Sequence, residues 1–164
     1  MVFVLQAAIA MVIFAGLLPG VLFAGEVGTR ELIGAALALL GIAIEAIGDW
    51  QLFRFKADKN NVGKVLDTGL WAYTRHPNYF GESLFWWSLF LLTVQMDTVW
   101  TILSPVIMTF LLLRVSGVWM MEKGRTGKNP AYQKYQQETP VFFPRFRKVS
   151  VATSNQPEDK ENVL

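Results

Sequence analysis

The amino-acid sequence predicts an all-α integral membrane bundle of four transmembrane helices, followed by a short C-terminal interfacial helix. Three observations lead to this prediction. The 164 residues are 52% hydrophobic and 17% charged, whereas soluble domains average about 25% charged residues. Four apolar segments are long enough to cross a bilayer. The charged residues gather in the segments between and after them.

The predicted transmembrane helices span about 2–24, 30–56, 77–95 and 98–122. A hydrocarbon core of about 30 Å takes about 20 helical residues, and each segment approaches or exceeds this length. The first segment has no basic residues before its apolar run, so we expect a retained helix and not a cleaved signal peptide. The connector near Met96 is very short, which predicts an antiparallel pair for the last two helices.

A short amphipathic helix is predicted after the last crossing, over 130–138, because Asn129-Pro130 is a typical helix start. We expect one membrane domain over 1–148. Residues 149–164 are polar and without periodicity, which predicts a disordered tail.

Lysine and arginine residues indicate the orientation of the bundle. The stretch 54–75 holds five of them and the residues after 122 hold eight, whereas the turn after the first helix holds only Arg30. Basic residues are enriched on the cytoplasmic side of membranes, and four crossings place both basic stretches on one side. We therefore predict cytoplasmic termini, in the endoplasmic reticulum or a bacterial inner membrane.

The composition also excludes several classes of function. The chain has no cysteine, which excludes disulfides, thiol nucleophiles and Cys-ligated metals. A single histidine with no carboxylate pattern around it predicts no metal site. The formal net charge of +2 is too small to indicate a nucleic-acid partner. Basic residues beside apolar runs indicate a lipid bilayer or an anionic cofactor instead.

Two carboxylates lie within the second predicted helix. Glu45 and Asp49 are four residues apart and share one face, which Leu52 and Lys56 continue. A carboxylate at the centre of a membrane helix costs about 2.5–3.5 kcal/mol even on lenient insertion scales. We therefore expect a partner, a wet cavity or a ligand beside them. One alternative is purely structural: Arg114 of the fourth helix neutralises Asp49.

The densest polar cluster lies at the start of the third predicted helix. Ten residues there contain six candidate site residues: Tyr73, Arg75, His76, Asn78, Tyr79 and Glu82. A helix N-terminus presents free amide donors and a positive dipole end, which favours a phosphate or a carboxylate. The alternative is again structural, with Asn78 as a helix cap and His76 as an interfacial residue.

Three stretches, 48–56, 69–82 and 114–143, resemble one family. They include RHPNYFGE at 75–82 and PAYQKY at 130–135. These motifs resemble the integral membrane proteins with a steroid 5-alpha-reductase C-terminal-like domain (DUF1295-type), and the resemblance covers about 45–146. It implies an architecture related to sterol reductases and to isoprenylcysteine carboxyl methyltransferases.

The resemblance implies an NADPH-dependent oxidoreductase that reduces a carbon–carbon double bond of a lipid or sterol-like substrate. NADPH would lie near the cytoplasmic face, and no catalytic residue is assigned. The expected cofactor-binding residues come from the second and third helices, their connecting loop and the C-terminal part: Glu45, Asp49, Lys56, Tyr73, His76, Asn78, Tyr79, Glu82, Arg114, Glu122 and Tyr132. Residue types alone are consistent with this, because these segments supply cations, amides, carboxylates and aromatic faces on one side of the membrane.

Full-length relatives carry further helices upstream, which supply much of their lipid pocket, whereas this chain has one. We therefore expect a truncated product, or a homo- or hetero-oligomer that completes the pocket. An S-adenosylmethionine-dependent membrane methyltransferase is the closest alternative, since that family shares the Arg-His-Pro-x-Tyr turn. A non-catalytic membrane module is a third possibility. Ligand binding by the purified chain distinguishes the three.

Overall fold

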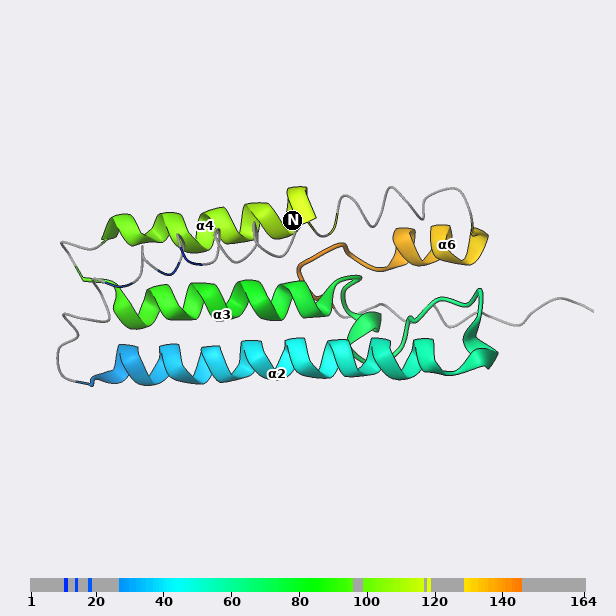
Figure 1. Cartoon of the computed structure of the whole chain (residues 1–164), viewed down its shortest axis with the longest axis horizontal. Coiled ribbons are helices and arrows are strands. Elements are labelled where there is room, and N and C mark those ends of the chain that lie inside the picture. The colour runs from blue at the N-terminus through cyan, green and yellow to red at the C-terminus, as the bar shows by residue number, and fades with distance from the viewer. Residues whose placement is uncertain are drawn as a thin grey trace, which may run out of the picture.

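Long helices run side by side among the described residues, and a shorter helix and several turns gather at one end of them (Figure 1). In this computed structural model the described residues are 27–95, 99–116 and 129–145, with Met11, Phe14, Leu18 and Val118. They form helices and turns, and no strand occurs among them.

Several predictions fall outside the described residues and stay predictions. They are the helix over 2–24, the connector at 96–97, the end of the fourth predicted helix with Glu122, and the disordered tail over 149–164.

The first described helix, α2, spans Thr29–Ala57 and matches the predicted 30–56 closely. The Gly28 amide donates to the Glu31 carboxylate (2.9 Å), which closes the N-terminal turn. At 1.5 Å per residue the helix is about 44 Å long, more than the thickness of a hydrocarbon core. Among the described helices, α2 is the one whose length and composition suffice to cross a membrane.

The next long helix, α3, spans Pro77–Thr93 and runs antiparallel to α2. The two backbones approach closely because small residues line the contact. A Cβ atom on Gly41 would lie 2.7 Å from the Gly81 carbonyl oxygen, and one on Gly81 would lie 2.6 Å from the Glu45 nitrogen. Small residues permit such close approach between apolar helices. We call Gly34, Ala38, Gly41, Gly48 and Gly81 the small-residue seam.

The fourth predicted helix is helical but not uniform. In the described residues it begins with a 3₁₀ segment, η3 (Val99–Ile102), continues as α4 (Leu103–Phe110) and then as a π segment, η4 (Leu111–Ser116). The change of helix type at Leu103 places Pro105 in the first turn of α4, where a missing amide hydrogen is tolerated. Thr109 joins α4 to α3 through the Ser83 hydroxyl (2.9 Å) and the Trp87 indole (3.1 Å).

The last described helix, α6, spans Pro130–Glu138, as predicted. The Asn129 side chain caps it by accepting from the Ala131 amide (2.9 Å). The chain then returns to the start of α3 (Figure 1). Two backbone hydrogen bonds hold it there: the Arg75 amide donates to the Pro140 carbonyl (2.9 Å), and the Arg145 amide donates to the Tyr73 carbonyl (3.0 Å).

The loop between α2 and α3 contains two short 3₁₀ helices, η1 (Lys59–Asn61) and η2 (Gly69–Ala72). Gly63 and Gly69 have positive φ angles of 81° and 62°, so their backbone is left-handed, which L side chains disfavour.

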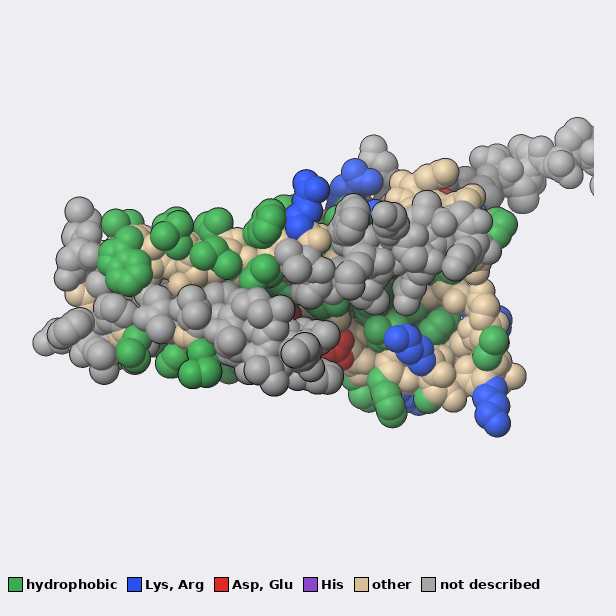
Figure 2. Space-filling view, turned by 45° about the horizontal axis from the view of Figure 1, so that its top comes forward, with side chains coloured by type: hydrophobic (Ala, Val, Ile, Leu, Met, Phe, Trp, Pro, Cys, Tyr) green, Lys and Arg blue, Asp and Glu red, His purple; other side chains and the backbone are tan. Residues whose placement is uncertain are grey.

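Apolar and charged surfaces are separated along the molecule. Large apolar side chains are exposed along α2 and α4, among them Leu39 (69% exposed) and Phe110 (58%). Figure 2 shows hydrophobic side chains over the half without α6, and lysine and arginine side chains over the other half. An exposed apolar surface of this kind suits a lipid environment.

Candidate functional site

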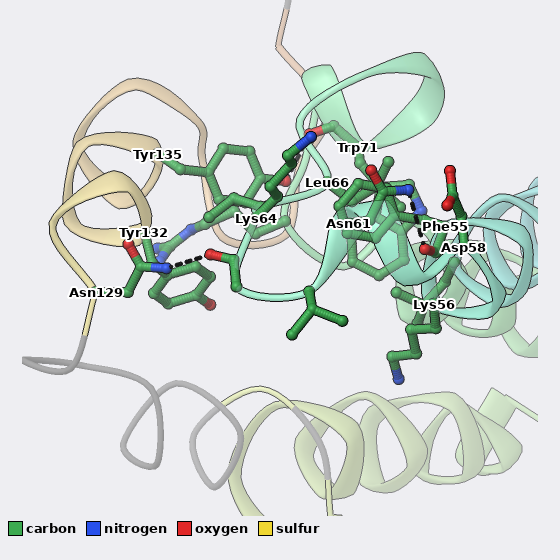
Figure 3. A pocket seen from close by; sticks show the side chains of 15 residues that line it. Phe55, Lys56, Asp58, Asn61, Lys64, Leu66, Trp71, Asn129, Tyr132 and Tyr135 are labelled. Carbon is green, nitrogen blue, oxygen red and sulfur yellow. Dashed lines mark hydrogen bonds between the residues drawn. The ribbon is translucent and has the colours of Figure 1, made fainter.

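A cavity of about 430 Å³ lies at the end of the helices where α6 packs. One wall is the last two turns of α2, with Leu52, Phe55 and Lys56. The loop over 58–66 forms a second wall, and α6 a third. Figure 3 shows Tyr132 and Tyr135 on one side of the cavity, opposite Phe55, Asn61 and Trp71.

The extra length of α2 creates this cavity. A Cβ atom on Gly48 would lie 3.2 Å from the Asn78 nitrogen and 3.3 Å from the Pro77 side chain, so α3 begins beside Gly48. The residues from Asp49 to Ala57 continue past that point by about 13 Å of helix. Figure 1 shows this extension beyond α3, with the loop and α6 beside it.

Hydrogen bonds from separate elements fix the walls. The Trp71 indole donates to the Gly48 carbonyl (3.1 Å), and the Tyr135 hydroxyl donates to the Trp71 carbonyl (2.6 Å). The Asn129 amide donates to the Gly63 carbonyl (2.8 Å) and so joins α6 to the loop. Each donor reaches a backbone oxygen of another element. The cavity is therefore held in shape by the fold itself.

The lining of the cavity combines cations with aromatic faces. Lys56, Lys64 and Arg75 supply positive charge, and among the lining residues Asp58 is the acidic one. Trp71, Tyr132 and Tyr135 are buried and contribute aromatic rings. Arginine and lysine bind phosphate through charge-assisted hydrogen bonds, and aromatic faces stack on flat rings. This chemistry suits a ligand with anionic phosphates and planar ring systems.

A second polar group lies where α2 passes the start of α3, next to the cavity along α2. The Asn78 side-chain amide donates to the Asp49 carboxylate (2.9 Å). Glu82 has Glu45 and Asp49 as electrostatic neighbours. We call Glu45, Asp49, Asn78, Tyr79 and Glu82 the carboxylate group. It exists because the small-residue seam brings α3 against the face of α2 that carries the two acids.

Some predicted site residues lie elsewhere. His76 is buried outside the cavity, next to the carboxylate group, and stacks on Tyr79 with ring centroids 5.6 Å apart. Tyr73 lines a different, smaller cavity. Arg114 is exposed on the π segment η4. The hydrogen-bond partner of Asp49 in the described residues is Asn78 rather than Arg114, and Asn78 lies inside α3 rather than at its cap.

The structure therefore distributes the predicted residues over two main places. Lys56 and Tyr132 line the larger cavity, while Glu45, Asp49, Asn78, Tyr79 and Glu82 form the carboxylate group. They are connected along α2, because Asp49, Leu52 and Lys56 lie on one face.

Most residues that line the cavity were not among those predicted to bind the cofactor, and three of them also hold its walls through hydrogen bonds: Trp71, Asn129 and Tyr135. Tyr135 carries a sequence signal, since it is three residues after Tyr132 on an amphipathic helix and shares its face. The sequence signal at Asn129 indicates only a helix cap. Trp71 has no sequence signal beyond its place in a glycine-containing loop, because its role depends on the distant Gly48 carbonyl.

Comparison with known proteins gives a family and one relative. Residues 1–139 match the family described as "Protein of unknown function (DUF1295)". A Schizosaccharomyces pombe protein named "Uncharacterized protein C594.04c" is 35% identical over 101 residues, which cover 56% of this chain and 27% of the relative. The chain thus spans about a quarter of the length of that relative. No solved structure matches the chain.

Proposed function

The chain belongs to the DUF1295 family, and we propose that it is a membrane-embedded, NADPH-binding, reductase-like protein. The observation that carries this proposal is the 430 Å³ cavity, whose lining pairs Lys56, Lys64 and Arg75 with the faces of Trp71 and Tyr132. Ligand pockets usually measure about 300–1,000 Å³. Both the volume and the residue types fit a substantial part of a dinucleotide.

The membrane placement is part of the same proposal. The apolar part of α2 ends near Gly48, where α3 begins, and the basic residues lie beyond that point. We place the membrane boundary there, with the cavity on the cytoplasmic side and with 2–24, α2, α3 and the helix from Val99 onward as four crossings. The large exposed apolar side chains of α2 and α4 support this placement.

The residues of the chain would bind and orient the cofactor. Lys56, Lys64 and Arg75 would pair with its phosphates, and Trp71 and Tyr132 would pack against its rings. When bound, NADPH supplies a hydride for a carbon–carbon double bond. The carboxylate group lies one to two turns of α2 toward the membrane, on the path that a lipid substrate would take to the cavity.

A lipid or sterol-like substrate would approach from the bilayer. Further helices, from another copy or from a different protein, would then complete the substrate pocket. S-adenosylmethionine has no phosphate group, so a cavity with three cations favours NADPH over that cofactor.

The test measures ligand binding to the full chain, purified in a mild detergent, by isothermal calorimetry and thermal unfolding. We expect NADPH to bind more tightly than NADH, because a cation of the cavity would pair with the additional phosphate of NADPH. Losing one charge-assisted contact of about 1.5–3 kcal/mol should weaken NADPH binding by about tenfold or more in Lys64→Gln. Lys59→Gln is the matched control, since Lys59 belongs to η1 and does not line the cavity.

Three results would contradict the proposal. Binding of S-adenosylmethionine without NADPH would favour the methyltransferase alternative. Binding of neither cofactor would favour a non-catalytic membrane module. Equal losses in Lys64→Gln and Lys59→Gln would show that the basic loop attracts anions without a defined site.

A further inference from the structure

The second cavity, of about 240 Å³, shares no lining residue with the larger one. Ile44 of α2 and Phe80 of α3 form part of its apolar wall. Its lining also includes Tyr73 and Arg145, two exposed residues whose side chains end in polar groups. The cavity is therefore apolar along its helices, and Arg145 belongs to its lining beside the loop.

This division coincides with the proposed membrane boundary. Ile44 lies one turn of α2 to the membrane side of Gly48, and Phe80 lies in the first turn of α3. Arg145 lies beside the loop, because its backbone amide donates to the Tyr73 carbonyl (3.0 Å). The apolar wall therefore falls inside the membrane, and the backbone of Arg145 lies at its surface. A phospholipid has the same order of groups, with acyl chain inward and phosphate outward.

We propose that this cavity binds an anionic phospholipid, with part of one acyl chain along Ile44 and Phe80 and the phosphate against Arg145. At about 30 Å³ for each water-sized group, the volume holds about eight such groups, a fitting size for a segment of an acyl chain. A guanidinium binds phosphate bidentately.

The segment that carries Arg145 is fixed before any lipid binds. The Thr74 hydroxyl donates to the Phe142 carbonyl (2.9 Å), and the Arg75 amide donates to the Pro140 carbonyl (2.9 Å). A site whose backbone is already in place loses less freedom on binding. Phe143, which is 74% exposed, extends from the same segment and suits an interfacial anchor.

The experiment uses the full chain in a neutral detergent without NADPH. Dioleoyl-phosphatidylglycerol, or dioleoylglycerol with the same acyl chains and no phosphate, is added. Bound lipid is counted by native mass spectrometry, with thermal unfolding alongside. We expect a preference for the anionic lipid of about tenfold or more, as one charge-assisted contact implies. Arg145→Gln should reduce this preference to about twofold or less. Its fold should persist, since the hydrogen bond from Arg145 to the Tyr73 carbonyl uses the backbone amide.

Ile44→Trp fills the apolar part and should abolish retention of both lipids. Two controls match these changes: Leu40→Trp, one turn away on α2, and Arg54→Gln, whose guanidinium lies over Trp50 and outside the cavity. Both should behave as wild type. Equal binding of the two lipids by wild type, or an unchanged preference in Arg145→Gln, would overturn the proposal.

This inference rests on the proposed membrane placement and not on the cofactor. NADPH added to Arg145→Gln should stabilise it as much as wild type, because Arg145 does not line the larger cavity. Loss of lipid preference with intact NADPH binding, or the reverse, therefore separates the two proposals.

Discussion

Between Gly34 and Gly48, α2 meets α3 through residues with little or no side chain, whereas from Asp49 onward the same helix faces long polar and aromatic side chains. In the seam, contact between backbones leaves no room for a ligand. Beyond it, α3 is absent beside α2, and hydrogen bonds from the loop and α6 hold a cavity open instead. Close packing and an open site thus occupy successive parts of one helix.

The difference shows how a small helical protein can position polar groups beside apolar ones. The seam fixes the distance between α2 and α3, and so brings Asn78 within 2.9 Å of Asp49. The extension then carries Lys56 beyond the start of α3, toward the basic loop. Rigidity in one region determines the geometry of the other, which is what a binding site requires.

The largest expected effect concerns the two ends of α2. Val27 precedes the helix and Asn60 follows it, and both are exposed. If α2 crosses the membrane with Asn60 inside, Val27→Cys should react with a membrane-impermeant thiol reagent in intact cells. Asn60→Cys should react only after permeabilisation. The chain has no native cysteine, so labelling reports the introduced site alone. Equal labelling of both in intact cells would refute the crossing.

The next effect compares a glycine of the seam with one of the loop. A Cβ atom on Gly81 would meet backbone atoms at 2.6 Å, whereas one on Gly63 would meet nothing within 4 Å. Gly81→Ala should destabilise the protein by about 3 kcal/mol, at the upper end of overpacking costs. Gly63→Ala should cost about 1–2 kcal/mol, from its φ of 81° alone.

Denaturant unfolding in detergent measures both glycine substitutions. If Gly81→Ala unfolded no more easily than Gly63→Ala, the close contact between α2 and α3 would be wrong.

The sequence predicted the elements better than their contacts. The bounds of α2, α3 and α6 follow from local signals, such as Pro77 and Asn129-Pro130 at helix starts. The change from 3₁₀ to α to π helix over Val99–Ser116 was missed, because each segment is only about one to two turns long and mostly apolar, which is too short to reveal its period.

The site was likewise predicted only where local spacing determines it. Glu45 and Asp49 share a face by spacing alone, and the structure places both in the carboxylate group. The separation of Tyr73 from Lys56 into different cavities depends on how the loop folds over Gly48 and Gln51. No local pattern in the sequence encodes those contacts.

The smallest expected effect tests which residue is coupled to Asp49. Two double-mutant cycles share Asp49→Asn, one with Asn78→Ala and one with Arg114→Gln, and both are measured by thermal unfolding in detergent. Asn78 donates to the Asp49 carboxylate at 2.9 Å, and hydrogen bonds to charged groups contribute about 1.5–3 kcal/mol. We expect a coupling energy of about 1 kcal/mol in the Asn78 cycle, because Asn at position 49 still accepts a weaker hydrogen bond. The Arg114 cycle should show about 0.3 kcal/mol or less, as for residues that share no contact. A large coupling energy with Arg114, in which the double mutant recovers the stability lost in each single mutant, would support the structural ion pair between Asp49 and Arg114. Asp49 would then have no role beside the cavity.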